Sequence, residues 1–206
     1  MIKVVMKTEP SDFNQLVRQP GNLFLKKNPN PNTKKFNSHN YWRTIKGEFL
    51  DSYEYTCAYC CQYIHLVTGS DNVEHFLPKT LYPNDAYEWV NYRLVCSLLN
   101  SRKGTQKILD PFKIQDGWFL IKFPSLLIIP NPSLKKDLQE EVQETIDILK
   151  LNLEGYDIVK SRCRYINCYC SGQFGFDHLM EEAPFLAREL VRQDMVESIK
   201  TNGVQR

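Results

Sequence analysis

A glutamate directly before a histidine, Glu74-His75, is the pair of residues in this sequence best suited to hydrolytic chemistry. A carboxylate binds a hard divalent cation, and a neutral imidazole takes a proton from water. The pair ends a short β-type run, which Pro78 then terminates. Neighbouring side chains of a strand point to opposite faces, so a turn or bulge is needed to bring both to one reaction centre. Because such dipeptides are common on protein surfaces, the pair alone is weak evidence.

Two asparagines further along the chain supply the partners that such a pair needs. Asn91 precedes a short apolar run that predicts a strand, and Asn100 falls in a short helix predicted after it. The side-chain amide of Asn91 is suited to hold the backbone of the loop before the strand. The amide oxygen of Asn100 and the carboxylate of Glu74 form an oxygen pair suited to Mg²⁺ or Mn²⁺.

The order of these motifs resembles that of HNH endonucleases. Glu74-His75, Asn91 and Asn100 match the family's acid-histidine pair, loop asparagine and helix asparagine. The likeness is closer still to the HNH subunits of Septu-type and retron-linked antiphage systems. It covers residues 57–104, through these segments: Cys57-Ala58-Tyr59-Cys60, residues 74–79, Tyr87-Glu88-Trp89-Val90-Asn91 and Lys103-Gly104.

The resemblance implies a ββα-metal fold and a role for each residue of the motif. It makes His75 the general base that deprotonates a water molecule, with an imidazole pKa near the operating pH. It makes Glu74 and Asn100 the ligands of Mg²⁺ or Mn²⁺. Asn91 then shapes the loop and supports His75.

Basic residues near the motif are candidates for contact with nucleic acid. The resemblance implies that Arg102, Lys103 and Lys79 bind the backbone that flanks the scissile bond. A solvated helix end, with charges that complement the helix dipole, explains Arg102 and Lys103 equally well. Two lysine pairs flank an Asn/Pro-rich loop, Lys26-Lys27 and Lys34-Lys35. We interpret them as a solubilising arm, with phosphate contact as the alternative.

The seven cysteines include a Cys-x-x-Cys motif, Cys57 to Cys60. A complete zinc ribbon needs a second such motif, but Leu99 stands three residues after Cys96. Because leucine cannot bind zinc, we expect either no structural zinc or a degenerate site at Cys57, Cys60 and Cys96. Two nearby residues remain alternatives for a fourth ligand: Cys61 and His65.

Apolar periodicity predicts the elements that surround the motif. The residues from Tyr41 to Tyr53 repeat at helical steps, and runs at 118–121 and 126–129 predict a hairpin. Three amphipathic helices follow: one that Ser133 caps, one along Val159, Cys163, Ile166 and Cys170, and one from Pro184 through Ile199. Pro20-Gly21 predicts a turn.

These elements predict an α+β fold, in which a small ββα-metal module is embedded in a largely helical single domain of residues 1–206. Residues 54–112 form the nuclease core, and residues 1–53 form an N-terminal arm and helix. Residues 113–206 form the hairpin and a helical cap, which exceeds what a minimal ββα site needs. We therefore expect this cap to be the region that docks a partner.

Composition limits the class of protein. Apolar residues make up 42% of the chain, which excludes wholesale disorder. The net charge of +2 permits nucleic-acid binding but does not argue for it. No apolar run reaches the ~18 residues of a membrane span, and the N-terminus does not resemble a signal peptide. We therefore expect a cytoplasmic protein without membrane contact.

The sequence thus predicts an HNH endonuclease that hydrolyses phosphodiester bonds with Mg²⁺ or Mn²⁺, in DNA rather than RNA. The resemblance implies an effector subunit of an antiphage defence system that works with an ATPase partner. The alternative is a non-catalytic nucleic-acid-binding or interaction subunit that retains an HNH-like scaffold. Because Glu74, His75 and Asn100 are all chemically competent, the enzyme is favoured.

Overall fold

The apolar repeat from Tyr41 to Tyr53 forms two consecutive helices in the computed structural model, which describes residues 1–153 and 158–202. A 3₁₀ helix, η2 (Tyr41–Ile45), runs directly into α3 (Lys46–Ser52). Ile45, Phe49 and Leu50 are buried, as the repeat predicts. The predicted helix is therefore confirmed, with a change from 3₁₀ to α geometry after its first turn.

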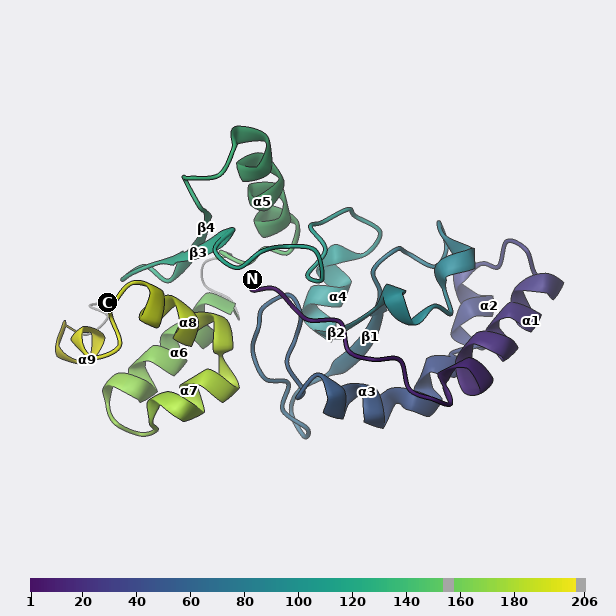
Figure 1. Cartoon of the computed structure of the whole chain (residues 1–206), viewed down its shortest axis with the longest axis horizontal. Helices are drawn as coiled ribbons and strands as arrows, with labels where there is room; N and C mark the ends of the chain where they lie inside the picture. Colours follow the sequence, from purple (N-terminus) through teal and green to yellow (C-terminus); the bar gives the residue numbers. More distant parts are fainter. Residues whose placement is uncertain (154–157, 203–206) are drawn as a thin grey trace. The chain divides into compact units, whose positions relative to one another are not determined.

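The chain forms two compact units, each of which contains helices and one small sheet (Figure 1). Unit 1 comprises Met1–Val4, Thr56–Tyr63 and Gln106–Arg206, and unit 2 comprises Val5–Tyr55 and Ile64–Thr105. The α+β class is thereby confirmed. This division does not by itself distinguish one folded domain from two, so the single domain and its boundaries stay predictions.

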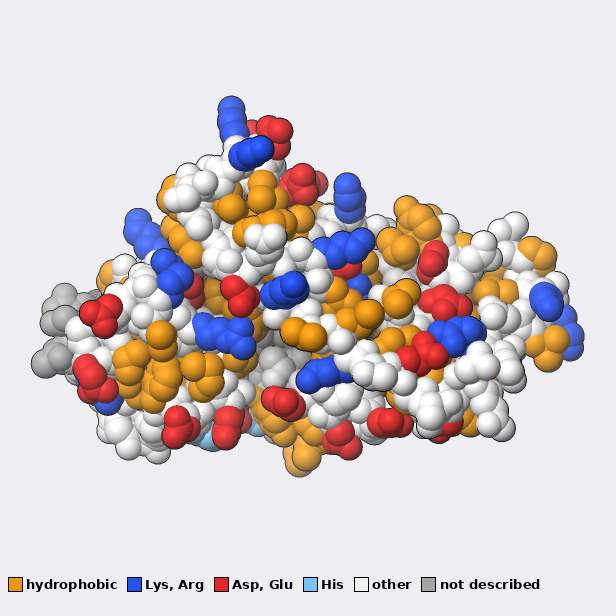
Figure 2. Space-filling model, in the orientation of Figure 1, with side chains coloured by type: hydrophobic (Ala, Val, Ile, Leu, Met, Phe, Trp, Pro, Cys, Tyr) orange, Lys and Arg blue, Asp and Glu red, His pale blue; other side chains and the backbone are white. Residues whose placement is uncertain are grey.

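Unit 2 begins with helices that the sequence did not predict. They are η1, a π-helix (Asn14–Arg18), α1 (Gln19–Lys27) and α2 (Thr33–Asn37). The turn predicted at Pro20-Gly21 is wrong, because Pro20 lies in the first turn of α1, where the missing amide proton costs nothing. Figure 2 shows Lys and Arg side chains over α1. The exposed lysine pairs of residues 26–27 and 34–35 belong to these helices.

The centre of unit 2 is a strand–strand–helix sequence. β1 (Asp71–His75) pairs antiparallel with β2 (Tyr92–Cys96), with Glu74 opposite Arg93 and His75 opposite Tyr92. The helix α4 (Ser97–Lys103) follows β2 directly and packs against both strands. Two short 3₁₀ helices lie in the loop between the strands, η3 (Pro83–Asp85) and η4 (Trp89–Asn91).

Aromatic side chains form much of the core of unit 2. The ring of Phe13 lies 5.4 Å from that of Trp89, and Trp89 lies 5.2 Å from Phe49, both in edge-to-face geometry. The indole Nε1 of Trp89 donates a hydrogen bond to the carbonyl of Lys7, at 2.8 Å. These contacts fasten the loop between β1 and β2 to the N-terminal part of the unit.

Unit 1 contains the predicted hairpin and five helices among its described residues. The strands β3 (Phe119–Lys122) and β4 (Leu127–Pro130) pair antiparallel, which confirms the hairpin. The helices are α5 (Lys136–Ile148), α6 (Ile158–Cys170), α7 (Phe176–Glu182), α8 (Pro184–Arg192) and α9 (Ser198–Asn202).

Three predicted details of these helices are wrong. Ser133 does not cap α5, which begins at Lys136 after a turn built on Asn131. The buried residues of α6 are Ile158, Arg162, Ile166 and Tyr169, so Cys163 and Cys170 are only half-buried. The predicted helix from Pro184 to Ile199 is two helices, because Asp194 adopts a positive φ of 54°.

The helices of the described residues are all too short or too polar to cross a membrane.

Candidate active site

Glu74, His75 and Asn100 line one cleft of unit 2, with a volume of about 630 Å³. β1 supplies the first two residues at the point where the strand ends, and α4 supplies the third. The strand, the loop that follows it and the end of α4 therefore form one wall of the cleft. The helices α2 and η2 contribute the residues that complete it. The three residues that the sequence singled out for catalysis thus line the same cleft.

Glu74 is buried and forms an ion pair with Lys103 at the end of α4. The Nζ atom of Lys103 lies 2.9 Å from Oε1 of Glu74, and the two side chains are 1% and 4% exposed. Removing two charges from water costs several kcal/mol each, and their attraction at this distance offsets that cost. The ammonium of Lys103 thus faces Glu74 instead of solvent, and its predicted contact with nucleic acid stays a prediction.

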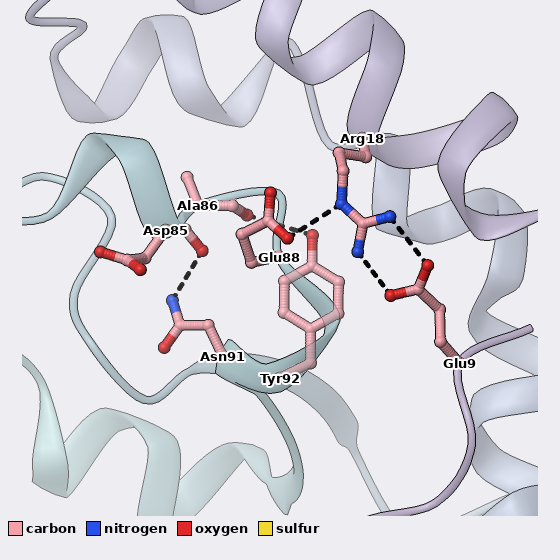
Figure 3. Close-up of polar contacts among 7 residues, drawn as sticks. All are labelled: Glu9, Arg18, Asp85, Ala86, Glu88, Asn91 and Tyr92. Carbon is pink, nitrogen blue, oxygen red and sulfur yellow. Dashed lines mark hydrogen bonds and ion pairs between the residues drawn. The ribbon is translucent and has the colours of Figure 1, made fainter.

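His75 is held by a backbone carbonyl of the loop. Its Nε2 atom lies 2.9 Å from the oxygen of Ala86, which also accepts a hydrogen bond from the hydroxyl of Tyr92, at 3.1 Å. The same hydroxyl and carbonyl are drawn in Figure 3. A carbonyl oxygen only accepts hydrogen bonds, so the proton of a neutral His75 is on Nε2. The Nδ1 atom is then the one that can accept a proton.

The charge state of His75 differs from the prediction. Burial, together with the neighbouring charges of Lys79 and Lys103, lowers the pKa of His75 to about 3. The predicted pKa near the operating pH is therefore wrong for this structure. The imidazole is neutral throughout the physiological range, which is the form that can accept a proton.

Asn91 anchors the loop between the two strands. Its Oδ1 atom accepts a hydrogen bond from the amide of Leu77, at 2.7 Å. Its Nδ2 atom donates to the carbonyls of Leu77 and Asp85, at 3.1 and 2.9 Å, and Figure 3 draws the second of these bonds. The predicted role of Asn91 in holding the loop backbone is therefore confirmed.

A second anchor, which the sequence did not predict, joins the loop to the N-terminal part of unit 2. The guanidinium of Arg18 binds both carboxylate oxygens of Glu9 and, through Nε, the carboxylate of Glu88 at 2.9 Å (Figure 3). The hydrogen bonds to Glu9 and then Glu88 raise the pKa of Arg18. The carbonyl of Glu88 accepts the amide of Asn91, at 3.0 Å, so the two anchors are adjacent. Arg18 and Glu88 are 70 positions apart in the sequence, so no local sequence pattern could predict their contact.

The predicted nucleic-acid-binding residues have different positions. Lys79 lines the cleft, where its Nζ donates to Oδ1 of Asn37, at 3.3 Å, and lies 5.5 Å from the centre of the Phe36 ring. Burial lowers the pKa of Lys79. Arg102 is half-buried on α4 and lies outside the set of described residues that line the cleft.

Residues of α2 and η2 that the sequence did not single out also line the cleft. They are Thr33, Asn37, Asn40, Trp42 and Arg43. The sequence places Trp42 and Arg43 in the predicted helix from Tyr41 to Tyr53, where Trp42 belongs to the apolar repeat, and it indicates no role for the others. Their approach to β1 depends on tertiary packing, so periodicity alone could not reveal it.

The donor set fits a divalent cation. The carboxylate of Glu74 and the amide oxygen of Asn100 are hard ligands, and both face the same cleft.

The cysteines of the predicted degenerate zinc site are not joined in disulfides and could offer sulfur ligands to a metal ion: Cys57, Cys60 and Cys96. The first two lie in unit 1, on a tight turn in which the amide of Cys61 donates to the carbonyl of Cys57, at 2.9 Å. Cys96 ends β2 in unit 2, and Leu99 is fully buried in α4. The expected absence of an intact zinc ribbon stays a prediction.

Comparison with known proteins finds a curated relative of part of the chain. The chain is 34% identical over 115 residues to the Septu protein PtuB of Bacillus thuringiensis. The match covers 52% of this chain and 41% of that protein, so the chain spans less than half of the relative's length. The chain matches no protein-family model.

Proposed function

We propose that this chain is an HNH-type endonuclease that hydrolyses phosphodiester bonds with the help of Mg²⁺ or Mn²⁺. β1, β2 and α4 form its ββα-metal module. The observation that carries the proposal is the arrangement of one cleft. A neutral histidine with Nδ1 as its proton acceptor shares that cleft with the carboxylate of Glu74 and the amide of Asn100.

The residues of the motif and their neighbours have distinct tasks in this proposal. The Nδ1 atom of His75 accepts the proton of the attacking water, while Ala86 fixes the orientation of the ring. Glu74 and Asn100 hold the divalent ion, and Lys103 fixes the position of Glu74. When bound, the ion stabilises the charge on the phosphate and on the leaving oxygen. Asn91 keeps the loop, and with it the carbonyl of Ala86, in place.

The biological setting that we propose is a Septu-type antiphage defence system, in which the chain is the effector subunit and works with an ATPase partner. Similarity to the Septu protein PtuB supports this setting. DNA is the proposed substrate, with RNA as the alternative. A nuclease without a sequence-reading module needs a source of control, and a partner supplies it.

The alternative is a non-catalytic subunit that binds nucleic acid through the same scaffold. A labelled oligonucleotide, incubated with the protein in Mg²⁺, Mn²⁺ or EDTA, distinguishes the two. The proposal predicts cleavage with either metal and none in EDTA. Binding without cleavage in both metals, with and without a candidate ATPase partner, would favour the non-catalytic subunit.

A further inference from the structure

The cleft has a second wall, which is the part of its lining that α2, η2 and the turn between them supply. Asn37 ends α2, Asn40 precedes η2, and Trp42 and Arg43 lie within η2. Two amides, a partly exposed indole and an exposed guanidinium therefore line this part of the cleft. None of these side chains has a task in the hydrolysis proposed above.

The charges of the cleft favour an anionic ligand. Its titratable lining residues are Arg43, Lys79, Glu74 and His75. Glu74 is paired with the buried Lys103, and the Nε2 atom of His75 is hydrogen-bonded to the carbonyl of Ala86. Arg43 and Lys79 are therefore positively charged residues of the cleft lining, and the one carboxylate of that lining, Glu74, pairs with Lys103 and not with either of them. Phosphate oxygens are the ligand that guanidinium and ammonium groups recognise in nucleic acids.

The aromatic residue of the wall is suited to stack on a base. Trp42 is half-buried, and the guanidinium carbon of Arg43 lies 5.8 Å from the centre of the Trp42 ring. An aromatic ring beside a cation is the arrangement that single-strand-binding proteins use, because every base has a stacking face and every nucleotide a phosphate.

The size of the cleft limits the form of the ligand. A volume of about 630 Å³ lies in the range of small-ligand pockets, roughly 300–1,000 Å³, which is too small to enclose a duplex. Bases of an unpaired strand, in contrast, are free to leave the stack and lie on an aromatic side chain.

We propose that this second wall binds an unpaired nucleic-acid strand next to the scissile phosphate. Trp42 stacks on a base, and Arg43 contacts the backbone phosphates together with Lys79. The inference rests on the proposed nuclease function, since it assigns the substrate strand to the same cleft.

The test measures binding of a fluorescein-labelled 12-nucleotide strand by anisotropy over a range of salt concentrations. The full chain carries His75→Ala, so that no cleavage occurs, and the strand is tested as DNA and as RNA. Trp42→Leu should weaken binding about 5- to 150-fold, the worth of one stacked base, without changing the salt dependence. Trp42→Phe, which keeps an aromatic face, should restore most of the affinity.

Arg43→Gln should instead lower the slope of log K against log salt by about 0.7, the value for one lost phosphate contact to a single strand. The matched control is Lys46→Gln. Lys46 lies at the start of α3, outside the cleft lining, and its Nζ pairs with Asp71 at 2.7 Å. This control should change neither the affinity nor the slope.

The outcomes separate the inference from the function on which it rests. If the His75→Ala protein binds no strand and the wild type cuts none, the proposed function itself fails. If the wild type cuts but Trp42→Leu and Arg43→Gln behave like Lys46→Gln, the inference is overturned while the function stands. Equal or tighter binding of a duplex of the same sequence would overturn the preference for an unpaired strand.

Discussion

The side chain of Lys103 is buried, although its sequence context indicates an exposed lysine. Lys103 follows Arg102 at the end of a short helix, and this position predicts a lysine that is solvated or binds phosphate. In the structure it is 1% exposed and lies 2.9 Å from Glu74. Two neighbouring basic residues of a helix point in different directions, and the sequence alone does not say which one turns inward.

We predict that Lys103→Met destabilises the protein by about 3–5 kcal/mol, because it removes one partner of a buried ion pair and so takes the Lys103 ammonium away from the buried carboxylate of Glu74. Lys46→Met is the control, since the Lys46–Asp71 pair is much more exposed, at 38% and 25%. Lys46→Met should lower the free energy of unfolding by less than about 1 kcal/mol. Urea denaturation of both variants gives the two free energies of unfolding. A loss below about 1 kcal/mol for Lys103→Met would show that the pair contributes little.

Much of the site at residue level was predictable because its residue types lie at characteristic spacings. Glu74 and His75 at a strand end, Asn91 in the loop and Asn100 on the helix are placed as the motif indicates. The low pKa of His75 was not predictable, because it depends on burial and on the charges of Lys79 and Lys103.

At the scale of elements, the packing of α1 against the loop depends on a glycine. A Cβ atom on Gly21 would lie 2.1 Å from Cγ and 2.7 Å from Cβ of Tyr87. These atoms are close to the backbone of Tyr87, so the ring cannot swing away cheaply. The hydroxyl of Tyr87 also donates to the carbonyl of His39, at 3.0 Å. Gly21 therefore sets the distance between α1 and the loop that carries Ala86 and Asn91.

Gly21→Ala should accordingly destabilise the protein by about 1–3 kcal/mol, the usual cost of overpacking. Gly47→Ala is the matched control in α3, where a Cβ would meet no atom within 4 Å. It should be neutral or stabilise by up to about 1 kcal/mol, because alanine loses less backbone entropy in a helix. Thermal melting of the two variants makes the comparison. A Gly21→Ala protein as stable as Gly47→Ala would refute the close packing.

Elements with strong periodicity were predicted, whereas those defined by tertiary contacts were not. The hairpin and α5 follow from apolar runs and repeats. The helix α1 was missed because Pro20-Gly21 has the composition of a turn. Proline is tolerated in a first helical turn, and glycine is needed there by Tyr87 rather than by the local backbone.

At the scale of the whole chain, the C-terminal helices have to be assigned either to a core or to a docking surface. Their apolar residues are largely buried within unit 1, which leaves fewer for a partner than the sequence suggested: Val142, Ile146, Leu149, Ile166, Phe185, Leu186 and Leu190. Glu189 of α8 is also buried and accepts the amide of Ile121 in β3, at 2.8 Å. The apolar stripes thus serve unit 1 itself, and docking of an ATPase stays a proposal for its exposed surface.

Truncation after Asn131 should therefore yield insoluble protein, because it removes the helices that cover the hairpin. Expression followed by separation of soluble and pelleted fractions measures the outcome. A truncated chain that remains soluble, with the circular dichroism expected for its remaining helices, would show that the helices are not required for folding. If such a chain also failed to co-purify with the ATPase, the helices would be the docking surface after all.

The central claim is that His75 acts as the base of a phosphodiesterase, and the rate of strand cleavage by His75→Ala tests it most directly. The substitution should lower the rate in Mn²⁺ by roughly 10²–10⁴-fold, the usual worth of a positioned acid–base group. Circular dichroism should show an intact fold. His178→Ala is the control, because that histidine is exposed in α7 of unit 1, and it should cut at the wild-type rate. A folded His75→Ala protein that cuts as fast as wild type, or a wild type that cuts in no metal, would contradict the account.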